Sequence, residues 1–236
     1  MRMSPSVALM AAAIALSPGT ARADMPKDCT FHENPARQIT ACSDFIEKNP
    51  RSADAFNNRG FAFGRVQEAK QAIADFDTAI RLNPKFAVAY NNRGIALRLT
   101  GKLDEALKDF DKAIELQPKY VLAHIGRGVT NTVKGNLDAA AKDFEAAIKI
   151  DPKAGPAWRG RGNVSMRQQK FAEAIVFYNQ ALILDLRDAD SYYNRGLAYE
   201  ASGQPGIAIV NYRLALKYNP ALQDAARQLE RLGQKP

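Results

Sequence analysis

The feature that most constrains the fold of this chain is a period of 34 residues that starts at Ala53. An arginine-glycine pair returns at this interval, at residues 59–60, 93–94, 127–128, 161–162 and 195–196. Two alanine columns keep the same register, the first at Ala72, Ala106, Ala140, Ala174 and Ala208 and the second seven residues later. Between them runs an aromatic column of Phe76, Phe110, Phe144, Tyr178 and Tyr212. Several columns in one register indicate that the chain repeats a single structural unit.

The spacing within each unit predicts two antiparallel helices. A second aromatic column lies four residues before each glycine, which places both on one face of a first helix; its members are Phe56, Tyr90, His124, Trp158 and Tyr192. The alanines and the later aromatic mark a second helix. Proline ends that helix in four units because it has no backbone N–H, at Pro84, Pro118, Pro152 and Pro220, while Leu186 takes the fourth place. Gly101, Gly135 and Gly203 fall between the helices, where a left-handed turn is expected.

These columns resemble the tetratricopeptide repeat (TPR), whose glycine, alanines, aromatics and proline stand at the same places. The resemblance covers units 53–86, 87–120, 121–154, 155–188 and 189–222. It implies an all-α fold, a right-handed superhelical α-solenoid of stacked antiparallel helix pairs. The units depart from the common pattern at position 7, where every one has arginine instead of leucine, and also at His124 and Leu186.

The residues on either side of the repeats are expected to cap them. Residues 24–52 are partly in frame and predict a half-repeat that covers the first unit. Residues 223–236 predict a terminal helix and tail, with one apolar side that packs on the fifth unit and one charged side that faces solvent. The apolar stripe consists of Leu222, Ala225, Ala226, Leu229 and Leu232.

Residues 1–23 have the order of a secretory signal peptide: Arg2, a short apolar stretch from Val7 to Leu16, and small residues up to Ala23. Cleavage after Ala23 would start the exported chain at Asp24 and place it in the periplasm or outside the cell. An uncleaved membrane anchor is the alternative, but the apolar stretch is shorter than the ~20 residues that span a bilayer. No membrane insertion is expected after cleavage.

Export determines how the two cysteines, Cys29 and Cys42, are interpreted. An oxidising compartment favours a disulfide between them. A metal site that adds His32 is the alternative, but it offers three ligands where structural zinc usually has four. We therefore expect a disulfide, and no metal or other cofactor.

The composition leaves the partner open but argues against nucleic acid. The net charge is +8, yet 33 Lys and Arg are interspersed with 25 Asp and Glu and form no basic tail.

The sequence patterns that resemble catalytic motifs are explained by the repeat. Gly160 and Gly162 stand at helix positions rather than in a nucleotide-binding turn. The Asp-Phe-Asp sequences at 75–77 and 109–111 recur in register, which indicates a structural role. No enzyme activity is predicted.

The resemblance implies that the first helices line a concave groove that holds a peptide. Asparagine side chains there would bond a peptide backbone, apolar neighbours would contact its side chains, and arginines would favour an acidic or carboxylate-ended segment. The alternative is that the asparagines belong to this repeat subtype and bind no ligand. The expected peptide-binding residues are Asn58, Phe61, Arg65, Asn92, Ile95, Arg98, Val129, Arg159, Asn163, Arg167, Tyr193, Asn194 and Leu197.

The arginine column suggests a second kind of contact. An aspartate follows the arginine by 16 residues in the first three units, at Asp75, Asp109 and Asp143, and is the expected ion-pair partner. Phe177 and Asn211 take that place in the last two units, which leaves Arg161 and Arg195 as possible contacts for an anion. The alternative is that both arginines find other carboxylates or water.

The sequence therefore predicts a non-catalytic scaffold or adaptor that binds a protein or peptide of unknown identity. A self-assembling structural protein, with homo-oligomers formed through repeat faces or the terminal helix, is the first alternative. An envelope enzyme or accessory that acts on glycan or cell-wall material is the second. It would need acidic or histidine residues that break the repeat pattern and converge in the groove, and the sequence contains none that do.

Overall fold

The structure, a computed structural model, describes residues 25–235, and all of the regular secondary structure between them is helical. The all-α fold of paired helices predicted from the sequence is confirmed. The predicted signal peptide, residues 1–23, lies outside the described residues. No helix between residues 25 and 235 has the length and apolar character needed to cross a membrane.

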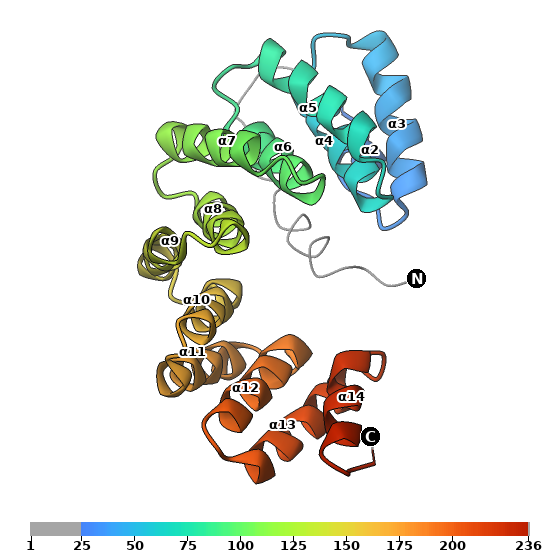
Figure 1. Cartoon of the computed structure of the whole chain (residues 1–236). Coiled ribbons are helices and arrows are strands. Elements are labelled where there is room, and N and C mark those ends of the chain that lie inside the picture. Colours follow the sequence, from blue (N-terminus) through green and yellow to red (C-terminus); the bar gives the residue numbers. More distant parts are fainter. Residues whose placement is uncertain (1–24, 236) are drawn as a thin grey trace. The chain divides into compact units, whose positions relative to one another are not determined.

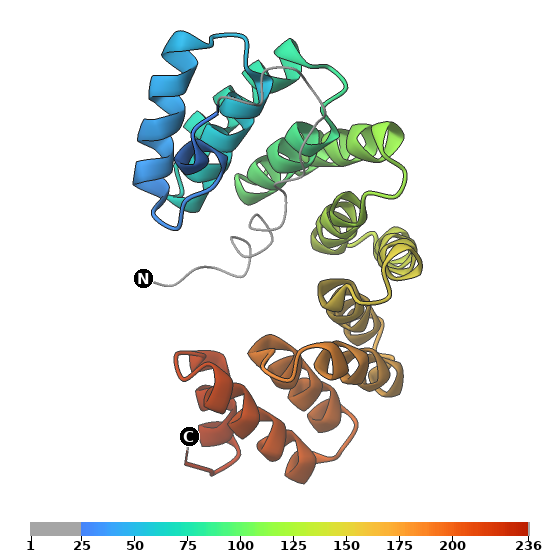
Figure 2. The ribbon, with the colours of Figure 1, turned by 180° about the vertical axis from the view of Figure 1, so that it is seen from behind.

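The chain divides into two compact units, residues 1–130 and 131–236, with the boundary inside α8 (Val121–Lys134). Each unit is a stack of helices in which neighbours along the chain pack side by side (Figures 1 and 2). The first unit contains α2 (Lys27–Thr30), α3 (Pro35–Lys48), α4 (Ala53–Arg65), α5 (Ala69–Leu82), α6 (Ala87–Leu99) and α7 (Leu103–Leu116). The second contains α9 (Leu137–Ile150), α10 (Gly155–Arg167), α11 (Phe171–Leu184), α12 (Ala189–Ala201), α13 (Pro205–Tyr218) and α14 (Gln223–Arg231).

The helices follow the 34-residue period of the sequence. The first helices of the repeats, α4, α6, α8, α10 and α12, begin at Ala53, Ala87, Val121, Gly155 and Ala189. The second helices are α5, α7, α9, α11 and α13. All members of both alanine columns and of the aromatic column between them are buried. Glycine is needed beside them: a Cβ on Gly162 would lie 2.6 Å from Cε1 of Tyr178, closer than real Cβ atoms approach.

The turn between the two helices of a repeat needs a positive φ angle. Gly101, Gly135 and Gly203 have φ angles of 81°, 87° and 79°, as the sequence predicted. Gln67 and Gln169 occupy the same place in the other two repeats, with φ angles of 66° and 59°. Left-handed backbone is unfavourable for a residue with a Cβ, so these two turns are strained.

The second helices end at the same place with or without the proline. α11 stops at Leu184 although Leu186 replaces the proline. Directly after the helix, the Asp185 side chain accepts a hydrogen bond of 2.8 Å from the Arg187 N–H, which turns the chain. Asn83, Asp151 and Asn219 make the same contact to the residue two places later. The end of α11 is therefore set by the turn residue Asp185 and does not require a proline.

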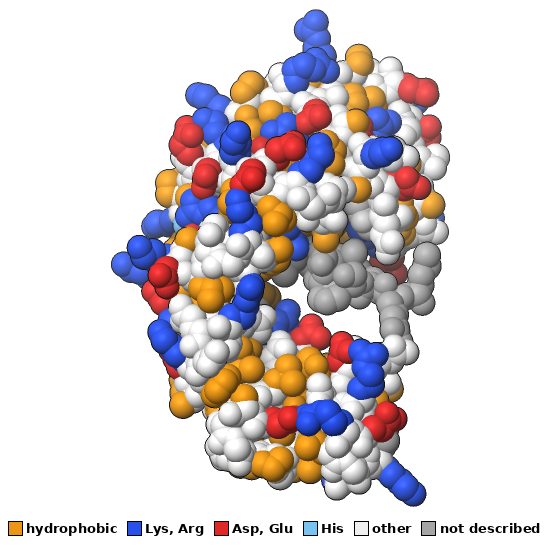
Figure 3. Space-filling model, in the orientation of Figure 1, with side chains coloured by type: hydrophobic (Ala, Val, Ile, Leu, Met, Phe, Trp, Pro, Cys, Tyr) orange, Lys and Arg blue, Asp and Glu red, His pale blue; other side chains and the backbone are white. Residues whose placement is uncertain are grey.

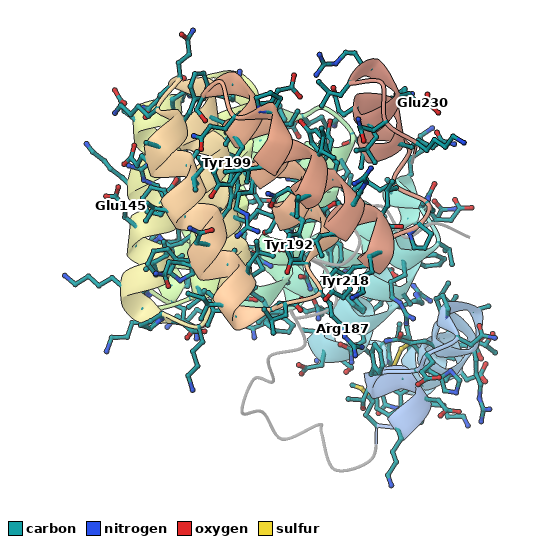
Figure 4. The ribbon with its side chains drawn as sticks, turned by 90° about the horizontal axis from the view of Figure 1, so that it is seen from below. Glu145, Arg187, Tyr192, Tyr199, Tyr218 and Glu230 are labelled. Carbon is teal, nitrogen blue, oxygen red and sulfur yellow. A yellow bond between two sulfur atoms is a disulfide. The ribbon has the colours of Figure 1, made fainter. Side chains whose placement is uncertain are left out.

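Both ends of the described chain are capped by packed helices. Cys29 and Cys42 form the predicted disulfide, which joins α2 to α3 and is fully buried with Phe45 and Ala55. The bond is drawn in yellow beside the blue ribbon in Figure 4. At the other end, Ala225 and Leu229 of α14 are fully buried against the fifth repeat. These caps cover the apolar faces that the terminal repeats would otherwise expose.

Candidate functional site

Each first helix carries its arginine toward two second helices, its own and the one before it. Arg93 on α6 makes a two-point contact with Asp109 on α7, with Nε and Nη2 each 2.7 Å from a carboxylate oxygen. Its Nη1 bonds Asp77 on α5 at 2.5 Å. The arginine thus joins its own repeat to the preceding one, and we call this arrangement the arginine clamp. The pKa of the Arg93 guanidinium is raised, chiefly by its hydrogen bonds to Asp109.

Only half of the clamp was predicted from the sequence. The partner 16 residues later is confirmed for Arg59 and Arg93, which bond Asp75 and Asp109. The partner 16 residues earlier was missed, although the recurring Asp-Phe-Asp sequences contain it. In those sequences the first aspartate bonds the arginine of its own repeat, and the second bonds that of the next repeat. The earlier partners are Ser43, Asp77, Asp111, Glu145 and Asn179.

Arg161 corrects the expectation that it is an unpaired cation. Its Nε bonds Glu145 on α9 and its Nη2 bonds Glu173 on α11, both at 3.0 Å. The guanidinium also lies over the Phe177 ring, 4.7 Å from the ring centre. Phe177 has replaced the aspartate, but Glu145 and Glu173 supply the negative charge, and Arg161 is buried. Arg161 is therefore a structural residue, as the alternative stated above supposed.

Arg195 is the member of the column whose described partners are all neutral. Its Nε donates to Asn211 on α13 and its Nη1 to Asn179 on α11, both at 2.7 Å. Its guanidinium also lies 5.3 Å from the centre of the Tyr192 ring. Burial lowers the pKa of Arg195, and no carboxylate within the described residues compensates its charge. Contact with an anion at this arginine stays a prediction.

The asparagines predicted for the groove form short ladders on the first helices of each unit. In the first unit, Asn92 on α6 donates to Asn57 on α4 at 3.0 Å. Asn58 is buried beside them, and its side chain contacts Met25. In the second unit, Asn194 on α12 donates to Asn163 on α10 at 3.2 Å, and Tyr178 donates to the same oxygen at 2.8 Å. The asparagine pairs therefore join neighbouring repeats.

The arginines predicted for the groove fall into two groups. Arg65 bonds the backbone oxygens of His32 and Glu33, Arg159 bonds Asp188, and Arg167 bonds the Thr132 carbonyl, so these three have partners within the fold. Arg98 on α6 differs. Its Nε is buried with no hydrogen-bond partner in the described part of the chain, and burial lowers its pKa. Nearby on the same helix, the buried Oδ1 of Asn91 also lacks a partner.

The apolar residues predicted for the groove lie deeper than the sequence suggested. Phe61 and Ile95 are buried in the core cluster around Phe76 and Phe110. Tyr193 and Leu197 are partly buried against the cluster that includes Tyr212. Val129 is half-buried. Phe61 and Ile95 therefore contribute to repeat packing and leave no surface for a ligand, whereas Val129, Tyr193 and Leu197 remain partly exposed.

The fold and these contacts define a class of protein: an α-helical repeat protein in which helix pairs of constant length stack through small residues, aromatics and a bridging arginine. Comparison of the sequence with family models identifies the family. Models described as "Tetratricopeptide repeat" match residues 87–120, 126–154 and 189–222, and one described as "TPR repeat" matches residues 162–203. The chain belongs to the tetratricopeptide repeat family.

Solved structures agree on the fold. The chain is similar to a chain of the APC/C hetero-tetramer Cut9-Hcn1, with a TM-score of 0.77 and 22% identity over 84% of this chain and 39% of that one. It is similar to a TPR protein from Parabacteroides merdae, with a TM-score of 0.68 and 20% identity over 83% of this chain and 77% of that one. It is also similar to YrrB, described as a TPR protein with an unusual peptide-binding site, with a TM-score of 0.58 and 21% identity over 80% of this chain and 97% of that one.

These likenesses establish the fold and leave the partner open. The chain spans only 39% of the Cut9-Hcn1 chain it matches, so the activity of that assembly does not transfer to it. No curated protein matches the sequence. Membership of the TPR family suggests a protein-protein interaction scaffold and does not identify the ligand.

Proposed function

We propose that this protein is an exported, non-catalytic scaffold or adaptor that binds a peptide or protein segment along the first helices of its repeats. The observation that carries the proposal is the pair of unsatisfied polar atoms on α6: a buried donor on Arg98 and a buried acceptor on Asn91. Buried polar groups in native proteins nearly always have partners, so such a pair favours a ligand that supplies both an acceptor and a donor.

An extended peptide meets that requirement because its backbone alternates carbonyl and N–H groups. A carboxylate on the peptide would gain more at Arg98, whose charge no side chain of the described residues balances. The other proposed contacts in the first unit are Asn58 and Val129, whereas Phe61, Asn92 and Ile95 are at most 1% exposed and would support the site from below. In the second unit they are Asn163, Tyr193, Asn194 and Leu197.

The proposal can be tested by capture from an envelope extract of the source cell, followed by mass spectrometry. Two variants are compared with the wild type: Arg98→Gln, which removes the uncompensated donor, and Lys108→Gln, which removes a charge from the exposed side of α7. We expect a partner that is captured by the wild type and by Lys108→Gln and is depleted with Arg98→Gln. Equal capture by all three, or no capture above an unrelated bait, contradicts the proposal. Circular dichroism verifies that each variant is folded.

Export is the second part of the proposal. It is supported by the buried disulfide, which fits an oxidising compartment, and by the signal-like order of residues 1–23. Expression of the full chain in a bacterium, followed by fractionation and intact-mass measurement, tests it. We expect a periplasmic or secreted product that starts at Asp24 and has no free thiol. A full-length cytoplasmic product with two reactive thiols contradicts export.

A further inference from the structure

Two neighbouring second helices, α11 and α13, expose an apolar surface where the earlier second helices expose charge. Val176 and Ile183 on α11 are 55% and 69% exposed, and Ile207 and Val210 on α13 are 43% and 54% exposed. In Figure 3 hydrophobic side chains, in orange, gather on the lower part of the surface, where Figure 1 places α11 to α13. We call these four residues the apolar patch.

The repeat register shows that the patch replaces charged residues. Val176 and Val210 stand at position 22 of their units, where the second and third units have Lys108 and Lys142. Ile183 stands at position 29, where the units before it have arginine, glutamate and lysine. All of these positions point to the surface, so packing does not require the change. An exposed cluster of large apolar side chains marks a site of interaction more often than chance.

Arg195 lies between the two halves of the patch. It bonds Asn179, which is on the same face of α11 as Val176 and Ile183, and Asn211, which follows Val210 on α13. Both asparagines replace acidic residues of the arginine clamp, so a cation with no carboxylate lies between two apolar stripes. Beneath it, Tyr192 stacks on Tyr218 with ring centres 5.7 Å apart, and both are labelled in Figure 4.

The earlier clamps show that a carboxylate at the surface can reach the arginine at this position of the repeat. Asp77 bonds Arg93 at 2.5 Å although its side chain is 55% exposed, and Asp111 bonds Arg127 at 2.7 Å while 60% exposed. Asn179 stands at the corresponding position beside Arg195. At the next such position, α13 carries Arg213, which donates a hydrogen bond to the side-chain oxygen of Gln234. The charge at position 25 therefore changes from negative to positive along the chain.

We propose that the apolar patch and Arg195 form a docking surface for an amphipathic helix of a partner protein, with apolar side chains that flank a glutamate or aspartate. The apolar rows of the partner would pack on α11 and α13, and its carboxylate would approach the Arg195 guanidinium from the surface beside Asn179. Apart from Arg195, whose side chain extends from α12 to bond α11 and α13, this surface is formed by second helices, so it is separate from the proposed peptide contacts on the first helices.

Charge also argues against a second copy of this chain as the occupant. A two-fold contact through the patch would bring Arg195 and Arg213 of one copy against the same arginines of the other. Like charges placed together at an interface oppose association. A partner with negative charge between its apolar rows is the complementary match.

A phage-displayed library of helical peptides of about 16 residues, randomised on one face, tests the proposal. The purified protein is the selection target. The variant Val176→Lys/Val210→Lys, which copies the lysines of the second and third units, is used for counter-selection, so that peptides that bind outside the patch are discarded. We expect selected peptides with apolar residues three or four places on each side of an acidic residue. Changing that residue to its amide should weaken binding by about tenfold.

The variant Asn179→Asp provides the decisive comparison, because it supplies an internal carboxylate to Arg195 as Asp77 does for Arg93. We expect it to fold as the wild type does and to bind the selected peptides about tenfold more weakly. The matched control Asp77→Asn, in the first unit, should leave binding unchanged. No peptide specific to the patch, selected peptides without a carboxylate, or equal binding by Asn179→Asp overturns the proposal. So does a wild-type oligomer, seen by light scattering, that Val176→Lys/Val210→Lys dissolves.

This test and the capture experiment with Arg98→Gln have independent outcomes. Val176→Lys/Val210→Lys and Asn179→Asp change second helices of the second unit, whereas Arg98→Gln changes a first helix of the first unit. A protein can therefore fail one experiment and pass the other. Failure of peptide binding at the patch leaves the scaffold function proposed above as it stands.

Discussion

The arginine clamp at Arg93 should be a major source of stability, which the variant Arg93→Met tests. Methionine keeps the apolar stem and removes the guanidinium. It leaves Asp109, whose side chain is 7% exposed, without its two hydrogen bonds and without a compensating charge. Breaking a buried ion pair by removing one partner costs about 3–5 kcal/mol, but the Arg93 side chain is 22% exposed and water relieves part of the loss. We expect a loss of about 2–3 kcal/mol in the free energy of unfolding.

Urea denaturation followed by far-ultraviolet circular dichroism measures the loss. Arg37→Met is the matched control, because Arg37 also pairs with an aspartate, Asp28, but is 64% exposed; we expect less than about 1 kcal/mol there. The double variant Arg93→Met/Asp109→Asn should recover part of the loss, because an amide is less costly to bury than an unpaired carboxylate. If Arg93→Met lost no more stability than Arg37→Met, the assigned role of the clamp would be wrong.

The same variant should respond to pH in a defined direction. Burial raises the pKa of the Asp109 carboxyl, and the contacts with Arg93 oppose that rise. Without Arg93 the folded-state pKa increases further above the unfolded value, so the folded state binds a proton more tightly than the unfolded state. The loss in Arg93→Met should therefore shrink as the pH falls from about 7 toward 4. A loss that is constant over this range would indicate that Asp109 stays ionised or hydrated.

Three further changes test other parts of the fold by the same denaturation assay. Gln67→Gly should stabilise the protein by about 1 kcal/mol because it relieves a left-handed turn, and Gly101→Gln should destabilise it by a similar amount; equal stabilities would argue against strain. Gly160→Ala places a Cβ 2.3 Å from Cε1 of Phe144 and should cost about 1–3 kcal/mol, whereas Gly206→Ala has open space and should cost nothing. Cys29→Ser/Cys42→Ser should destabilise α2 and α3 by about 3 kcal/mol in hydrogen exchange, and unchanged protection there would refute this.

The helices could be predicted from the sequence because the repeat columns are steric requirements. Gly162 must be small where the ring of Tyr178 crosses it, and such a requirement recurs wherever the same two helices meet. The period therefore indicated where the first and second helices lie, and the all-α fold is confirmed. The disulfide between Cys29 and Cys42 was predictable because both cysteines fall in one short segment of a chain with a signal-like start.

The site could be predicted less well because its contacts cross between repeats. The sequence pairs Arg93 with Asp109 in its own unit, but only the stacking brings Asp77 of the preceding unit to the same guanidinium. For the same reason the sequence left Arg161 as a possible contact for an anion, whereas the preceding helix supplies Glu145. The turn at Gln67 was missed because a positive φ angle at glutamine has no signal in composition.

The arginine clamp and the exposure of the patch residues argue that the apolar patch is not needed for folding. Arg195 still bonds both neighbouring second helices when asparagine replaces the acidic residues, with two hydrogen bonds where Arg93 makes three, and it loses the charge balance. Val176 and Val210 are exposed to water and lie outside the buried core. On α11 and α13, therefore, two sets of repeat positions change together. Asparagine replaces the acidic residues of the clamp at Asn179 and Asn211, and valine replaces the surface lysine at Val176 and Val210. The valines expose apolar surface to water, and the asparagines leave the charge of Arg195 without a carboxylate. Both changes favour a partner that brings apolar side chains and a carboxylate to the same place.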